Sequence, residues 1–111
     1  MNKKLVEFKS PVREYELVVV FKPFLPGKSD ASSDSSFEEF LKGHGVKIDG
    51  KDVWGKRYLA YKIETQSEGY YILYNLRVVS NKLGKLKKDI ERRREILRYL
   101  ILRSDKKAIR S

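Results

Sequence analysis

Few side chains in this chain could carry acid–base or metal chemistry. His44 is the only histidine among 111 residues, and there is no cysteine to serve as a nucleophile or thiolate ligand. The flanking Gly43 and Gly45 are typical of a helix C-terminus, so we interpret His44 as a residue that closes a helix. The glycines lack the spacing of a dinucleotide-binding or phosphate-binding loop. The sequence therefore predicts no enzyme, no cofactor and no metal site.

Basic residues dominate the charged side chains. The chain has 25 Lys and Arg against 15 Asp and Glu, a net charge of +10. From Arg77 to Ser111 there are 13 Lys and Arg against 4 Asp and Glu, a net of +9, so the last third carries most of the charge. Such an excess attracts polyanions, of which nucleic acid and anionic membranes are the common ones.

The length favours a single domain. We expect an N-terminal extension over residues 1–12, one domain over 13–104 and a basic tail over 105–111. The extension has no secretory apolar core, and no apolar run approaches the ~20 residues that cross a bilayer. We therefore expect a soluble, intracellular protein without disulfides.

Hydrophobic periodicity and turn residues predict six elements in the order β-α-β-β-α-β. These are a strand over Arg13–Lys22, a helix over about Ser36–Lys42, a long strand or hairpin over Val46–Ile63, a strand over Tyr70–Val79, a helix over about Asn81–Arg93 and a strand over Ile96–Arg103. This order is typical of the α+β ferredoxin-like fold, in which a four-stranded antiparallel sheet carries two helices on one face.

Capping and turn residues set the expected boundaries. The segment Leu25–Ser36 is rich in serine and aspartate and is predicted to be a loop or a weak helix start. Ser35 and Glu38 fit a capping box at the first helix, and Ser80 is the expected N-cap of the second. Glu64–Gly69 is expected to be a polar turn.

The long second strand contains two glycines that mark bulges or turns, Gly50 and Gly55. After them, Leu59, Tyr61 and Ile63 alternate with more polar positions. The alternation predicts that these three side chains face the core.

The first and last strands predict a second surface on the other side of the sheet. If Tyr99 and Ile101 point into the core, then the last strand directs its alternate residues toward Val18 and Val20 of the first strand. Those alternate residues are Arg98, Leu100 and Leu102. Such a face suits both RNA phosphates, through arginine, and a protein partner, through its aliphatic patch.

Four sequence blocks resemble a known family. They are Arg13-Glu14-Tyr15-Glu16, Trp54-Gly55-Lys56-Arg57 followed by Leu59-Ala60-Tyr61-Lys62-Ile63, Gly69-Tyr70, and Ile96-Leu97-Arg98 closing at Arg103. The chain is similar from Arg13 to Ser104 to the bacterial-type small-subunit ribosomal protein six family. The resemblance implies a structural protein of the ribosome, in the cytoplasm or in an organelle, that binds the central domain of small-subunit ribosomal RNA together with small-subunit protein eighteen.

The resemblance and the strand alternation give two sets of candidate site residues. The candidate RNA contacts are Arg13, Lys56, Arg57, Arg98 and Arg103. The candidate contacts to the protein partner are Val18, Val20, Leu100 and Leu102.

Two other functions use the same fold. An RNA recognition motif stacks bases on sheet aromatics, and Glu68-Gly69-Tyr70-Tyr71-Ile72-Leu73-Tyr74 is similar to its third-strand signature. However, the basic residue expected before the glycine is Glu68, and the first strand lacks the companion aromatic. A small ferredoxin-like enzyme or metabolite sensor is the other alternative, because a fold alone does not define a function.

Overall fold

The computed structural model describes residues 11–23 and 30–104. The elements are β1 (Val12–Phe21), α2 (Asp30–Gly43), β2 (Lys47–Ile63), β3 (Gln66–Val79), a 3-10 turn (Ser80–Lys82), α3 (Leu83–Glu91) and β4 (Ile96–Arg103). Residues 1–10 of the expected extension and the expected tail over 105–111 lie outside the described residues.

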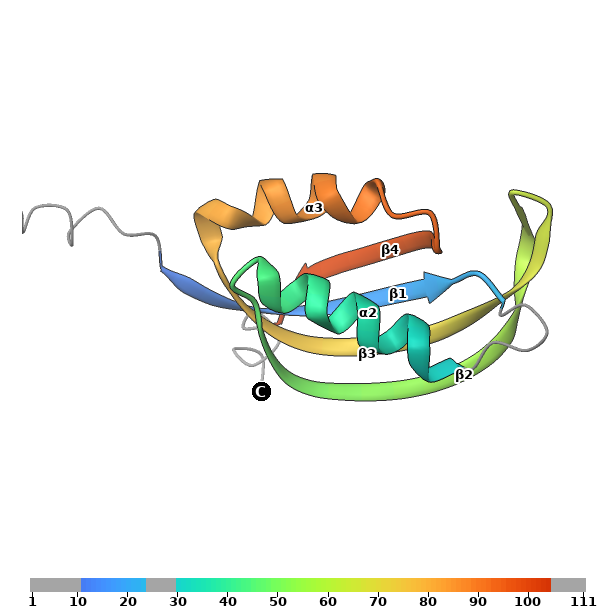
Figure 1. Cartoon of the computed structure of the whole chain (residues 1–111), viewed down its shortest axis with the longest axis horizontal. Helices are drawn as coiled ribbons and strands as arrows, with labels where there is room; N and C mark the ends of the chain where they lie inside the picture. Colours follow the sequence, from blue (N-terminus) through green and yellow to red (C-terminus); the bar gives the residue numbers. More distant parts are fainter. Residues whose placement is uncertain (1–10, 24–29, 105–111) are drawn as a thin grey trace, which may run out of the picture.

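The four strands form one antiparallel sheet in the order β2-β3-β1-β4, and both helices lie on the same side of it (Figure 1). The apolar residues of β1 explain this arrangement, because alternate positions from Tyr15 to Phe21 are buried. The predicted α+β, ferredoxin-like architecture is confirmed.

The core lies between the helices and the covered face of the sheet. Phe37 and Leu41, one turn apart on α2, are fully buried, as are Leu86 and Ile90 on α3. The Phe37 ring meets Phe21 of β1 edge to face, with centroids 5.5 Å apart. Burying each such side chain stabilises the fold by about 1.5–3 kcal/mol, so these residues hold the two helices on the sheet.

Several predicted boundaries are wrong. Helix α2 already begins at Asp30, so Ser35 lies inside the helix and is not its N-cap. The polar turn consists of Glu64 and Thr65 alone, both with positive φ, and β3 begins directly after them. Ser80 caps no helix with its side chain and instead starts the 3-10 turn. In each case tertiary pairing or packing outweighs the local propensity that the prediction used.

The register of β2 shifts at both predicted glycines. Irregularities lie between Ile48 and Gly50 and between Val53 and Gly55, so the predicted bulges are confirmed. Beyond Tyr70, which pairs with the last residue of β1, the β2–β3 hairpin continues past the sheet and curves at its end (Figure 1). We call this part, residues 57–69, the hairpin arm.

Three residues of the arm that were expected in the core lie outside it. Leu59, Tyr61 and Ile63 were predicted to face the core, but none of them belongs to it. The side chain of Tyr61 is 61% exposed, and Leu59 is half-buried. The bulge before Gly55 reverses the alternation of β2, and the arm has no helix above it.

Candidate RNA and protein interface

The face of the sheet opposite the helices carries an apolar patch. Val18 pairs with Leu100 across β1 and β4, and Leu102 lies opposite Glu16. Leu100 and Leu102 are 55% and 52% exposed, whereas Val18 is half-buried. No helix of the described part of the chain covers this side, which we call the open face. Exposed aliphatic residues gathered on one surface are typical of an interaction site.

Val20 differs from the rest of the predicted patch, because it is only 2% exposed. The hairpin arm covers it. A Cβ atom added to Gly69 would lie 2.4 Å from Val20 Cγ1 and 3.5 Å from Leu59 Cδ2. Only glycine at position 69 therefore allows the arm to pass this close to Val20. Val20 belongs to the floor of the open face and not to its exposed surface.

Aromatic and cationic side chains occupy the arm end of the open face. The Trp54 ring stacks on Tyr71 with centroids 6.2 Å apart, and the Arg57 guanidinium lies 5.4 Å from the Trp54 centroid. Trp54 is the extra residue at the second β2 bulge, which directs its ring onto this face. Stacked rings with a guanidinium above them suit both nucleotide bases and a partner's side chains.

The arm also reaches the far edge of the sheet. Arg98 of β4 donates a hydrogen bond to the hydroxyl of Tyr61, at 2.6 Å, and its guanidinium lies 5.4 Å from the Tyr61 ring. At the arm's tip, Lys22 forms an ion pair with Glu64 at 3.2 Å. Next to this contact, the open face has a hollow of about 510 Å³ lined by Val18, Trp54 and Leu100, among others.

The five candidate RNA contacts fall on two sides of the sheet. Arg57 and Arg98 share the open face with the apolar patch. Arg13 follows the alternation of Tyr15 in β1, and Arg103 follows that of Tyr99 and Ile101 in β4, so both belong to the helix side.

Lys56 also lies on the helix side, because it pairs with Tyr70, which packs against the core. The structure therefore brings together only two of the five candidate RNA contacts, Arg57 and Arg98, next to the apolar patch.

Three further residues belong to this surface: Trp54, Tyr71 and Tyr61. Alternation with the buried Ile72 of β3 predicts the side of Tyr71, but strict alternation does not predict the sides of Trp54 and Tyr61 in β2. The bulge at Gly55 changes the alternation in the middle of β2, so the face of each later residue depends on a backbone feature that periodicity does not locate.

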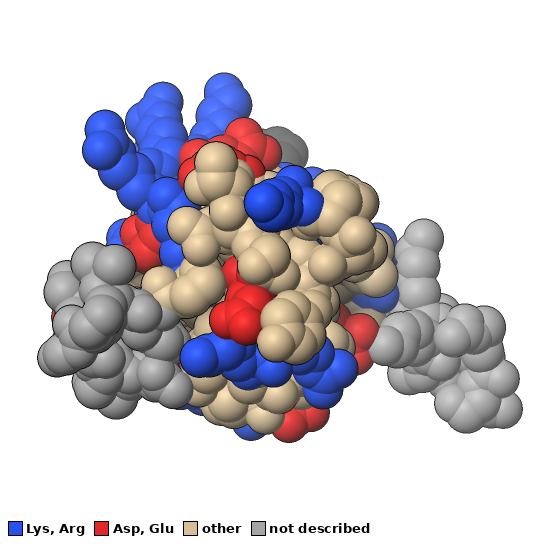
Figure 2. All heavy atoms as spheres, turned by 90° about the vertical axis from the view of Figure 1, so that its right-hand side faces the viewer, with Lys and Arg blue, Asp and Glu red and all other residues tan. Residues whose placement is uncertain are grey.

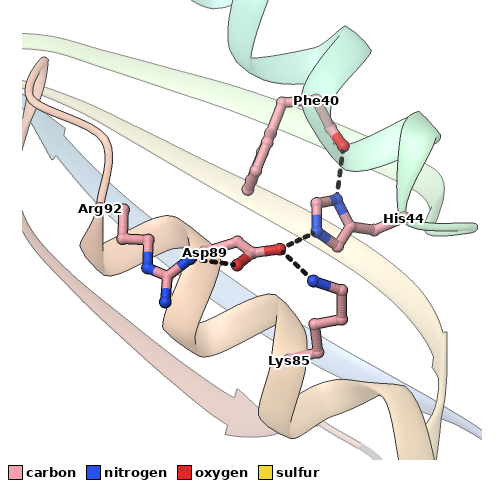
Figure 3. Close-up of polar contacts among 5 residues, drawn as sticks. All are labelled: Phe40, His44, Lys85, Asp89 and Arg92. Carbon is pink, nitrogen blue, oxygen red and sulfur yellow. Dashed lines mark hydrogen bonds and ion pairs between the residues drawn. The ribbon is translucent and has the colours of Figure 1, made fainter.

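His44 closes α2, as predicted. The amide N–H groups of Gly45 and Val46 donate to the carbonyls of Lys42 and Leu41, and Gly45 has a φ of +77°, which together form a Schellman motif. The ring nitrogens of His44 lie 3.0 Å from the Phe40 carbonyl oxygen and 2.7 Å from Asp89 Oδ2 (Figure 3).

Both contacts of the His44 ring are to acceptors, one in α2 and one in α3, so the histidine joins the two helices. Among residues 11–23 and 30–104 there is no cluster of three or more potential metal ligands.

A polar cluster fixes the other end of α2 to the sheet. Lys51 of β2 lies 2.6 Å from Glu38 and 3.3 Å from Asp34 of the helix, and the Tyr74 hydroxyl donates to Glu38 at 3.0 Å. Burial lowers the pKa of Lys51, but the hydrogen bond to Glu38 and the charge of Asp34 outweigh it and leave the pKa raised. Burial and Glu38 also raise the pKa of Tyr74. This cluster has a structural role and lies on the helix side, away from the open face.

Comparison with known proteins agrees with this geometry. The profile of the family described as Ribosomal protein S6 matches residues 14–103. The small ribosomal subunit protein bS6 of Rhodococcus opacus is 36% identical over 95 residues, which are 86% of this chain and 100% of that protein. The chain belongs to the ribosomal protein S6 family. The protein of the same name from Mycobacterium tuberculosis is 30% identical over 95 residues, 86% of this chain and 99% of its own length.

A solved structure shows the same fold. The crystal structure of 30S ribosomal protein S6 from Thermotoga maritima superposes with a TM-score of 0.71 at 25% identity, over 90% of this chain and 96% of that one. Membership of the S6 family confirms the prediction of a non-enzymatic protein. None of the helices in the described part is long and apolar enough to cross a membrane.

Proposed function

We propose that this protein is a structural component of the small ribosomal subunit in the cytoplasm, where it binds the central domain of small-subunit RNA together with small-subunit protein eighteen. One observation carries this proposal: the open face places an exposed aliphatic patch next to two arginines on aromatic rings. Leaving Leu100 and Leu102 in water is unfavourable, so a protein partner covers them.

In this proposal the two parts of the open face bind different partners. The aliphatic patch binds protein eighteen, because its leucines can be buried in a packed contact. Arg57 and Arg98 bind phosphate groups at the rim, where their guanidinium groups donate several hydrogen bonds to one anion.

The names of the relatives support the ribosomal assignment, since the proteins of Rhodococcus opacus and Mycobacterium tuberculosis are both called small ribosomal subunit proteins. The alternative as an RNA recognition motif has one observation in its favour, the stacked pair of Trp54 and Tyr71. In that case the open face binds single-stranded bases directly and needs no protein partner.

A pulldown from lysate of the source organism at moderate salt tests the proposal. We expect recovery of protein eighteen and small-subunit RNA, and co-sedimentation of the protein with small subunits. Recovery of unrelated single-stranded RNA without protein eighteen supports the RNA recognition motif instead. A protein that stays entirely in the ribosome-free fraction contradicts both.

A further inference from the structure

The outer side of α3 carries a row of cations that the open-face assignment does not use. Lys85, Lys88 and Arg92 follow one another at helical spacing on this side. The side chains of Lys85 and Arg92 are 76% and 79% exposed. Figure 2 shows Lys and Arg side chains projecting from the top of the molecule, the side on which α3 lies in Figure 1.

Two hollows line this row. One, of about 670 Å³, lies between the end of α2 and the start of α3 and is lined by Lys42, His44, Lys82 and Lys85, among others. The next, of about 480 Å³, is lined by Lys85, Lys88 and Arg92, with Gly84 and Asp89. They share Lys85 and Asp89, so together they form a continuous track along the helix.

The charge of the track is strongly positive. Among the described residues, Asp89 is the only carboxylate that lines it, and it is shared by His44 at 2.7 Å, Lys85 at 3.1 Å and Arg92 at 3.9 Å (Figure 3). Lys82 and Lys88 form no ion pair within residues 11–23 and 30–104. The unpaired lysines keep their attraction for an anion, and the shared carboxylate holds Lys85 in position.

We propose that this track is a second RNA-binding surface, which holds the phosphate backbone of an RNA segment other than the one at the open face. The row from Lys85 to Arg92 spans two helical turns, roughly 10 Å, so it fits several successive phosphates better than one small anion. This inference relies on the proposed ribosomal role only for the choice of RNA as the polyanion.

The track does not suit the other common partners of basic surfaces. Of the apolar residues of α3, Leu86 and Ile90 are fully buried and Leu83 packs against the core, so the outer side has nothing to insert into a membrane. It also lacks the exposed aromatic or aliphatic anchors on which protein interfaces depend. Binding through lysine and arginine side chains is typical of phosphate contacts that carry no sequence information.

Fluorescence anisotropy with a labelled oligouridine of about twelve nucleotides tests the proposal. We compare the double variant K82Q/K88Q with K47Q/K62Q, which removes two exposed lysines from β2 and therefore the same charge. We expect K82Q/K88Q to weaken binding roughly tenfold and to reduce the slope of log affinity against log salt by about 1.4, or about 0.7 for each phosphate contact. The control should change affinity by no more than about twofold.

The variant R57Q/R98Q separates this inference from the proposed function. If K82Q/K88Q behaves like its control while R57Q/R98Q loses binding, the track is wrong and the open-face assignment stands. The reverse result keeps the track and contradicts the open-face assignment. A third outcome is that K82Q/K88Q binds RNA as tightly as the unchanged chain but no longer sediments with phosphatidylglycerol vesicles. This result assigns the track to lipid and overturns the proposal.

A tethered probe gives an independent readout in the assembled subunit. The chain has no cysteine, and a Cβ added at Gly84 meets nothing within 4 Å, so Gly84→Cys offers a single attachment point in the track. An iron chelate attached there should cleave small-subunit RNA next to α3, whereas the cysteine-free chain treated in the same way gives no cleavage. No cleavage from the Gly84→Cys protein in intact subunits contradicts the proposal.

Discussion

The two faces of the sheet are both rich in apolar residues, but only one of them is covered. On the covered face, alternate residues of β1 pack with Phe37, Leu41, Leu86 and Ile90 of the helices and are shielded from water. On the open face, Leu100 and Leu102 are more than half exposed, and aromatic residues with arginines surround them. The covered face stabilises the fold, whereas the open face is available for binding.

This difference indicates where mutations act. A change on the covered face should reduce the free energy of unfolding, because a cavity forms in a packed core. A change among the exposed residues of the open face should leave stability nearly constant and alter binding. The arm lies between these extremes, since it covers Val20 but extends beyond the core.

The largest expected effect is on the covered face. Phe37→Ala should reduce the free energy of unfolding by about 3–5 kcal/mol, because it leaves a cavity between α2, β1 and β3. Denaturant titration measures this, with Leu100→Ala as the control on the open face at about 0.5 kcal/mol or less. Equal losses in the two variants would show that the open face is also part of the core.

The next effect concerns the contact between the arm and the floor of the open face. Gly69→Ala should cost about 1–3 kcal/mol, because its methyl group would overlap Val20 Cγ1. The double variant Gly69→Ala with Val20→Ala should lose less than the sum of the single variants. Strict additivity in the denaturant melts would mean that the two residues do not meet.

A smaller effect is expected within the arm. Leu59→Ala should cost about 1 kcal/mol, well below the ~2–5 kcal/mol of a buried leucine, because Leu59 is half-buried and packs beside Gly69. The same denaturant titration distinguishes a half-buried Leu59 from a buried one. A loss above about 3 kcal/mol would place Leu59 in a core after all.

The smallest effect is the pH dependence of the helix junction. Hydrogen bonds from His44 and Lys85 hold the pKa of Asp89 below its ordinary value of 3.8. The carboxylate therefore contributes stability above that value, and the contribution is lost as the pH falls through it toward the lower pKa of the folded state.

Asp89→Asn removes this contribution, so the variant should be less stable than the unchanged chain at pH 7, and the difference should shrink near pH 3. Urea melts at the two pH values measure it. A difference that stays the same at both would show that the Asp89 carboxylate is not coupled to folding through these hydrogen bonds.

The sequence predicts the fold well and the site only partly. Strand β4 and the apolar alternation of β1 follow directly from local pattern, as does the end of α2 at Gly43. The side of each residue in β2 does not, because each of the two bulges, at Gly50 and at Gly55, reverses the alternation.

The sequence also does not show where the β2–β3 hairpin leaves the sheet, because that point depends on where β1 stops pairing with β3, at Phe21 and Tyr70. Tyr61 was therefore assigned to the core, although it contacts Arg98 on the open face. The start of α2 at Asp30 was missed for a related reason, because helix packing outweighs the weak propensity of serine and aspartate.

The central claim is that one face of the sheet binds a protein partner through leucine and RNA through arginine. Titration with purified protein eighteen, followed by titration with small-subunit RNA in its presence, tests this with Leu100→Asp and Arg98→Ala. Tyr61→Phe serves as a control for Arg98→Ala, because it removes the hydrogen bond to Arg98 but keeps the cation.

Leu100→Asp should weaken binding of protein eighteen at least tenfold, roughly 1.4 kcal/mol or more, because it places an unpaired charge in an apolar contact. Arg98→Ala should weaken RNA binding by a similar factor and leave the protein pair intact. If folded Leu100→Asp binds protein eighteen as tightly as the unchanged chain, the open face is not the partner's site.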